Sequence, residues 1–76
     1  MTTLQKMVRL TDILNKILPE WVECKRVEVL NDNMLFWFED DSAKDILEKA
    51  FTLRESEALR VGRDGTMFVM LSLDRC

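Results

Sequence analysis

Histidine is absent from this 76-residue chain, and glycine, proline and cysteine are scarce, with two, one and two residues. Without histidine, the commonest general base and metal ligand is missing. Both glycines fall in one predicted hairpin, and the chain has no G-x-S-x-G motif and no glycine-rich phosphate-binding loop. We therefore expect a protein that is not an enzyme, with no catalytic residue, cofactor or metal site.

Long apolar runs are absent as well. No segment approaches the roughly 18 apolar residues that a transmembrane helix requires, and charges interrupt the N-terminal segment before it resembles a signal peptide. The two cysteines, Cys24 and Cys76, form no C-x-x-C motif. We expect a cytoplasmic protein with free thiols and no membrane contact, and a Cys24–Cys76 disulfide is the disfavoured alternative.

The composition is that of one small folded domain, residues 1–76. Apolar residues make up 47% of the chain and charged residues 33%, which is typical of globular proteins. A chain of this length buries only about 60% of its unfolded surface, so assembly with copies of itself would add stability. The net charge of −3 disfavours a nucleic-acid partner without excluding one, because phosphate backbones attract basic surfaces.

Two segments have the periodicity of α-helices. Apolar side chains over residues 3–18 cover an arc of about 220°, which is wider than one packing surface requires. This width predicts a helix that packs on the core and also contacts something else. Residues 42–52 repeat apolar side chains at helical spacing, and Ser42 with Asp45 resembles a capping box at the start of that helix.

Four segments are predicted strands, arranged as two hairpins. Residues 25–30 alternate apolar and charged side chains, and a turn cluster at residues 31–33 joins them to the apolar residues 34–38. Asp64-Gly65 predicts a two-residue type I′ turn in the second hairpin. That turn would place Val61 opposite Phe68 and Leu59 opposite Met70.

The composition of the strands predicts their order in the sheet. Strands two and four (MLFWF and MFVML) are apolar on both faces, whereas strands one and three carry charges. Since central strands are covered on both faces and charges protect edge strands, we expect the order 3-4-2-1, with strands two and four adjacent and parallel. The expected fold is α+β, αββαββ, with both helices on one face of a four-stranded sheet. This is a ferredoxin-like βαββαβ arrangement whose first strand has moved to the end.

The sheet face away from the helices is the predicted binding site. On the expected register it has an apolar centre and a charged rim, as protein interfaces have. The predicted partner-binding residues are Leu35, Trp37, Met67, Val69 and Leu71, with Arg26 and Arg60 at the rim. In the alternative interpretation Trp37 is a core residue, and the two helices cover opposite faces of the sheet.

These features predict a small non-catalytic protein–protein interaction module. Its partner would be a second copy of the chain, or a larger protein that it inhibits or links to another, as accessory proteins of viruses and mobile elements do. The alternative function is binding of single-stranded nucleic acid, with a base stacked on Trp37 between Arg26 and Arg60. The acidic run Glu39 to Asp41 is interpreted as the approach to the second helix, not as a metal site.

Overall fold

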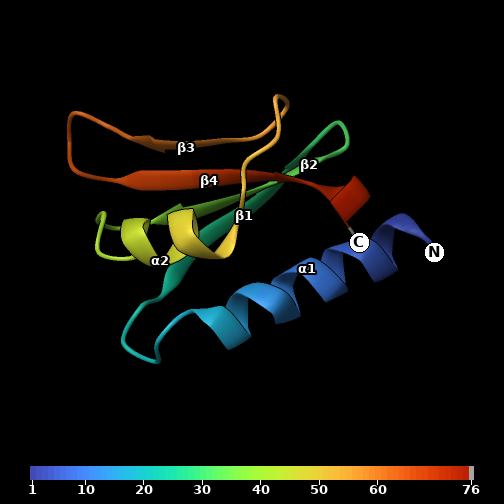
Figure 1. Ribbon diagram of the computed structural model, residues 1–76, viewed down its shortest axis with the longest axis horizontal. Coiled ribbons are helices and arrows are strands. Elements are labelled where there is room, and N and C mark those ends of the chain that lie inside the picture. Colours follow the sequence, from blue (N-terminus) through green and yellow to red (C-terminus); the bar gives the residue numbers. More distant parts are fainter. Residues whose placement is uncertain (76) are drawn as a thin grey trace.

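The computed structural model describes residues 1–75, and Cys76, one of the two predicted free thiols, lies outside the described residues (Figure 1). The fold is α+β, with the element order α-β-β-α-β-β followed by a short 3₁₀ helix. The elements are α1 (Thr3–Ile17), β1 (Cys24–Leu30), β2 (Asn33–Phe38), α2 (Lys44–Ala50), β3 (Ala58–Val61), β4 (Met67–Ser72) and η1 (Leu73–Arg75).

The four strands form one sheet in the order β1-β2-β4-β3, and every neighbouring pair is antiparallel. The doubly apolar strands β2 and β4 lie in the centre, and the charged strands β1 and β3 lie at the edges. The prediction that β2 and β4 run parallel is wrong. The crossover through α2 joins β2 to β3, not to β4, and the hairpin between β3 and β4 then reverses the chain direction.

Both α-helices cover the same face of the sheet (Figure 1), so the alternative with helices on opposite faces is not observed. α1 buries Leu10 and Leu14, and α2 buries Leu47. At the start of α1, Thr2 and Gln5 form a capping box: each side chain accepts the backbone N–H of the other residue.

The start of α2 differs from the prediction. Its N-cap is Ala43, and no side chain caps the helix, so the expected capping box at Ser42 is not formed. Instead, a carboxylate oxygen of Asp40 accepts the backbone N–H of Ser42 at 3.0 Å. The acidic run therefore shapes the turn into α2 without capping the helix itself.

The register of the β3–β4 hairpin is one residue away from the predicted one. Val61 pairs with Met67, and Gly62 donates its N–H to the carbonyl oxygen of Thr66 at 2.7 Å. The loop has three residues, 63–65, because Gly65 adopts a φ of 88° and donates its N–H back to Gly62 at 3.1 Å. A turn followed by a residue in the left-handed region is the common three-residue hairpin loop.

This one-residue shift moves every β4 side chain to the face opposite the predicted one. Met67, Val69 and Leu71 were predicted on the open face, but they lie in the core with 0–1% of their surface exposed. Phe68 and Met70 were predicted in the core, but they lie beside Trp37 and Leu35 on the open face. The prediction of Met67, Val69 and Leu71 as surface residues is therefore wrong.

One core fills the space between the helices and the sheet. It combines side chains from both α-helices, the two central strands, the segment after α2 and η1. Its members are Leu10, Leu14, Met34, Phe36, Phe38, Ala43, Leu47, Phe51, Met67, Val69, Leu71 and Leu73.

A buried ion pair fastens the C-terminal end of the chain to the segment before β3. The carboxylate of Glu57 accepts two hydrogen bonds from the Arg75 guanidinium, as well as the backbone N–H groups of Arg54 and Ser72. Burial alone would raise the pKa of Glu57, but these hydrogen bonds and the charge of Arg75 outweigh it and lower the pKa to about 2. The pair therefore holds a charged carboxylate inside the fold.

Candidate protein interface

The open sheet face carries an aromatic pair at its centre. Trp37 of β2 and Phe68 of β4 lie directly opposite each other, with ring centroids 5.0 Å apart and ring planes at 88°. This edge-to-face arrangement is a favourable one for aromatic rings. The indole Nε1 of Trp37 is buried and has no hydrogen-bond partner among residues 1–75.

Charged side chains cover part of this aromatic centre. The guanidinium carbon of Arg26 lies 4.7 Å from the centroid of the Trp37 ring, in the range of a cation–π contact. Arg26 also forms an ion pair of 2.9 Å with Glu28, two residues along β1. The open face is therefore less accessible to a partner than predicted: Leu35 is 9% exposed, and Trp37 is half-buried.

Of the seven predicted partner-binding residues, the structure brings four together on this open face: Leu35, Trp37, Arg26 and Arg60. The other three are the core residues of β4. The sequence interpretation also missed Phe68, which stands beside Trp37 on the open face. Phe68 reaches this face because the β3–β4 loop has three residues and not the predicted two.

A more exposed apolar surface lies between α1 and the edge strand. We call it the α1–β1 groove and define it by Leu4 and Val8 of α1 and Val27 and Val29 of β1. These four side chains are 68%, 55%, 45% and 43% exposed. The sheet residues of the core all come from β2 and β4, whereas no residue of β1 is buried.

Two neighbouring cavities lie between α1 and the strands in the α1–β1 groove. One of about 220 Å³ is lined by Leu4, Val8 and Met34, and a smaller one of about 40 Å³ is lined by Val27. Thr11 lines both cavities. On the sheet, Val29 pairs with Met34 of β2 and Val27 pairs with Phe36 of β2. The two cavities therefore meet at Thr11, and the strand partners of both exposed valines line them.

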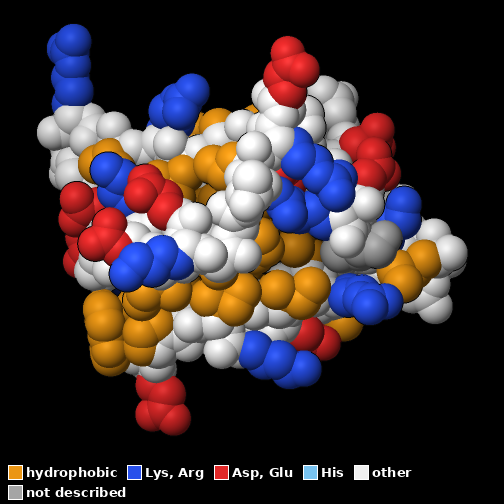
Figure 2. Space-filling model, viewed as in Figure 1, with side chains coloured by type: hydrophobic (Ala, Val, Ile, Leu, Met, Phe, Trp, Pro, Cys, Tyr) orange, Lys and Arg blue, Asp and Glu red, His pale blue; other side chains and the backbone are white. Residues whose placement is uncertain are grey.

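Apolar side chains also gather on the opposite side of α1. Figure 2 shows them as a band running along α1 below the sheet. Ile13 and Ile17 of α1 belong to the partly buried side chains that pack against the core. The wide apolar arc of residues 3–18 therefore has two roles: part of it packs on the core, and its outer part, Leu4 and Val8, stays exposed.

The outer edge of β1 has no partner among the described strands. Leu30 and Asn33 close the turn between β1 and β2, and hydrogen-bonded and non-bonded pairs then alternate along an antiparallel ladder. By this alternation, the N–H and C=O groups of Val27 and Val29 point away from β2. A row of backbone donors and acceptors therefore borders the apolar groove.

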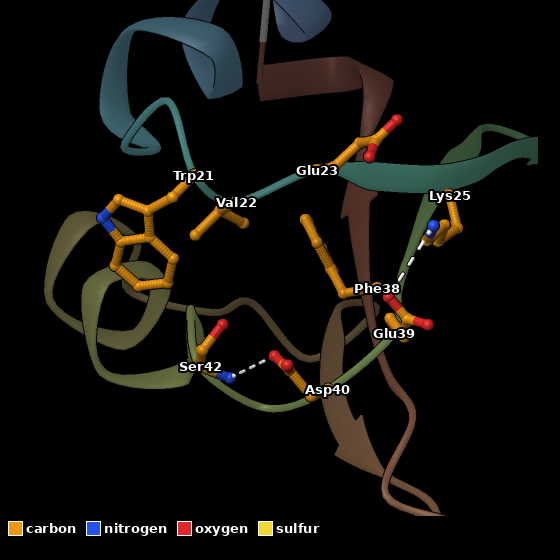
Figure 3. Close-up of a pocket in the computed structure, with 8 residues that line it drawn as sticks. All are labelled: Trp21, Val22, Glu23, Lys25, Phe38, Glu39, Asp40 and Ser42. Atoms are coloured by element: carbon orange, nitrogen blue, oxygen red, sulfur yellow. Dashed lines mark hydrogen bonds and ion pairs between the residues drawn. The ribbon is translucent and has the colours of Figure 1, made fainter.

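A pocket of about 200 Å³ lies at the other end of β1 (Figure 3). The ion pair between Lys25 and Glu39, 3.7 Å long, stands on one side of it, and the ring of Trp21 stands on the other. Hydrogen bonds from the side chain and backbone of Ser42 lower the pKa of Asp40. Within residues 1–75, no group of three or more His, Cys, Asp or Glu side chains is placed to hold a metal ion.

Cys24 stands at the start of β1 and is half-buried. Burial raises the pKa of its thiol, and hydrogen bonds with the backbone at Arg26 and Trp37 offset only part of that rise. The thiolate is the reactive form of cysteine. The position of Cys24 therefore suits a structural side chain better than a nucleophile.

Comparison with protein-family models, with curated proteins and with solved structures finds no match to this chain. Neither described α-helix has the length and apolar character needed to cross a bilayer. The function is therefore argued from the surfaces above.

Proposed function

We propose that this protein is a non-catalytic protein–protein interaction module that binds its partner in the α1–β1 groove and along the free edge of β1. The observation that carries this proposal is the set of four large apolar side chains, 43–68% exposed, beside an unpaired strand edge. Large contiguous apolar patches on the surface of a folded protein mark interaction sites.

The groove favours a protein partner over other ligands. A strand added at the edge of β1 would satisfy the outward backbone groups of Val27 and Val29, and its side chains would fill the groove, as in other strand-addition complexes. The partner is a second copy of the chain or a larger protein that it inhibits or links to another. Action in the cytoplasm, and a role as an accessory protein of a virus or mobile element, belong to the same proposal.

The arrangement of the strands supports the ferredoxin-like interpretation as a further part of the proposal. In that arrangement a crossover helix joins two strands that flank a third, and all neighbouring strands are antiparallel. Here α2 joins β2 to β3, with β4 between them. Moving the first strand of βαββαβ to the end would give the observed element order.

Two matched valine variants test the proposed interface. Val27 on β1 and Val61 on β3 both lie on edge strands, and they are 45% and 43% exposed. A charge at position 27 would be buried by the partner, so Val27→Glu is expected to weaken association about tenfold or more. Val61→Glu should leave association unchanged. Light scattering measures self-association, and retention by a candidate partner measures hetero-association.

The proposal is wrong if the Val27→Glu and Val61→Glu proteins behave alike in both assays. It is also wrong if the wild-type protein stays at the 9.0 kDa mass of one chain and retains no protein in a Val27-dependent way.

Binding of single-stranded nucleic acid is the second candidate function, and one observation favours it. The open sheet face presents two aromatic side chains, Trp37 and Phe68, on adjacent central strands between Arg26 and Arg60. Aromatic side chains on a sheet can stack unpaired bases. Against it, the Arg26 guanidinium already covers the Trp37 ring.

Oligonucleotide filter binding at low salt tests this candidate. If it is correct, binding weakens with added salt, and Trp37→Ala lowers affinity about tenfold, because one stacked base contributes about 1–3 kcal/mol. Absence of salt-sensitive binding by the wild-type protein excludes it.

A further inference from the structure

The sequence of β1 is complementary to itself when two copies run antiparallel. Val27 is the midpoint of the strand Cys24–Leu30. Arg26 and Glu28 flank it, and their side chains lie together on the open face of the sheet. An antiparallel copy centred on Val27 would therefore place each arginine opposite a glutamate.

We propose that the partner in the α1–β1 groove is a second copy of this chain, paired antiparallel through β1 with Val27 opposite the partner's Val27. This inference rests on the proposed function and names its partner. The result is a dimer with a two-fold axis through Val27 and one continuous eight-stranded sheet. Two-fold pairing closes the assembly and removes the free edge of β1.

The backbone of β1 fits this register. The ladder of β1 with β2 is irregular between Cys24 and Arg26 and regular from Arg26 to Leu30, so the three positions around the axis, Arg26, Val27 and Glu28, lie in the regular part of the strand. The N–H and C=O groups of Val27 point away from β2, so the two copies of Val27 exchange a pair of hydrogen bonds across the axis. Val29 offers its outward groups in the same direction.

The charges of β1 select this register over its neighbours. With Val27 at the axis, Arg26 stands opposite the partner's Glu28, and Glu28 opposite the partner's Arg26. A shift of two residues in one direction sets Arg26 against Arg26, and in the other direction Glu28 against Glu28. Like charges directly opposite destabilise a strand pair, and a shift of one residue would turn the helices of the second copy to the opposite face.

The neighbouring groups keep these charges in place. Arg26 is held 4.7 Å from the Trp37 ring centroid, and Lys25, the next cation on β1, is paired with Glu39 at 3.7 Å. Arg26 and Glu28 keep side-chain exposures of 59% and 46%. The two charges are therefore oriented by their own chain and still accessible to a second copy.

The apolar side chains of the groove lie on the other face, with the helices. In the dimer Val27 meets the partner's Val27 there, and Leu4 and Val8 of each copy line one shared groove. The apolar side chains of the α1–β1 groove, which are exposed in the single chain, are then covered in both copies of the dimer.

Two charge-reversal variants, mixed together, test the proposal. Arg26→Glu creates a strand with two acids, and Glu28→Arg creates a strand with two arginines. Each variant alone sets like charges opposite each other, so its self-association is expected to weaken about tenfold or more. Mixed one to one, the two strands are complementary, and native mass spectrometry should detect a heterodimer at about twice the 9.0 kDa of one chain.

Two further variants serve as controls. Arg60→Glu makes the same charge change on the other edge strand and should leave the dimer intact. The double variant, Arg26→Glu with Glu28→Arg, restores both the pairing within the chain and the pairing between copies, so it should be folded and dimeric. Rescue by mixing cannot come from the pairing within one chain, because each single variant lacks it.

Three results would overturn the second copy as partner: a wild-type protein that stays monomeric, single variants that dimerise as well as wild type, or a mixture without heterodimer. None of these decides the proposed function, which depends on the difference between Val27→Glu and Val61→Glu. If that difference appears with another protein, the groove is an interface and its occupant is not a second copy.

Discussion

Replacing Arg75 with alanine is expected to lower the free energy of unfolding by about 3–5 kcal/mol, because the change leaves a buried carboxylate without its cation. The side chain of Glu57 is fully buried, and that of Arg75 is 17% exposed. Arg75 also donates a hydrogen bond to the carbonyl of Thr52 and covers the ring of Phe51. Replacing Arg75 with alanine removes all of these contacts at once.

Urea unfolding measures this loss, with Arg63→Ala as the control. Arg63 is exposed in the loop between β3 and β4, so its replacement should change stability by less than about 0.5 kcal/mol. Arg75→Lys keeps the charge but not the paired geometry of the guanidinium, and it should fall between the two. Equal stability of Arg75→Ala and Arg63→Ala would refute the structural role of the ion pair.

The same pair predicts a specific acid sensitivity. The pKa of Glu57 is about 2 in the folded protein, against an ordinary value of 4.5. A lowered pKa stabilises the fold above pH 4.5, and this contribution, about 3 kcal/mol, is lost as the pH falls from 4.5 towards 2. The difference in stability between wild type and Arg75→Ala should shrink over that range. A difference that stays constant would contradict this account.

Leu71→Ala is expected to lower the free energy of unfolding by about 2–5 kcal/mol, and Met70→Ala by about 1 kcal/mol or less. The two residues are neighbours on β4 but lie on opposite faces. Leu71 is 0% exposed in the core, whereas Met70 is partly exposed on the open face. Removing the leucine side chain leaves a cavity under the helices.

This pair of variants tests the register of β4 directly. A two-residue turn at Asp64-Gly65 would exchange the two positions and reverse the order of the effects. Urea unfolding of both variants, compared with wild type, decides between the registers. A larger loss for Met70→Ala than for Leu71→Ala would show that the structural register is wrong.

The sequence predicted the elements and the positions of the strands because those depend on local pattern. The alternation in residues 25–30 and the two doubly apolar strands have the structures that their patterns indicate, and the helical spacing in residues 42–52 corresponds to a shorter helix, Lys44–Ala50. The face of β4 was predicted wrongly because it depends on a single residue of loop length. Gly65 in the left-handed region makes the loop three residues long, and the dipeptide alone does not distinguish the two loops.

The α1–β1 groove could be predicted only in part. The wide apolar arc of residues 3–18 indicated that the helix has more apolar surface than one core contact needs, and Leu4 and Val8 are that surplus. Alternation placed Val27 and Val29 on the helix face of the sheet, but it does not show how far the helices reach across that face. The buried side chains of the sheet come from β2 and β4 and none from β1, which leaves both valines exposed.

The ion pair of Glu57 and Arg75 was not predicted, because its two partners stand 18 residues apart in the sequence. The segment 52–57 is rich in polar residues and has no apolar periodicity that would indicate a buried position. Arg75 lies next to Glu57 because η1 follows the end of β4, where Ser72 contacts Glu57.

Hydrogen exchange at the amides of Val27 and Val29, followed by NMR at increasing protein concentration, tests the proposed interface most directly. Both amides point to the free edge of β1 and have no strand partner in the single chain, so they should exchange fast when the protein is dilute. The account predicts that they become protected as the protein associates, while the outward amide of Val61 on β3 stays fast. Exchange at Val27 and Val29 as fast as at Val61 at every concentration, with and without a bound partner, would contradict an interface at β1.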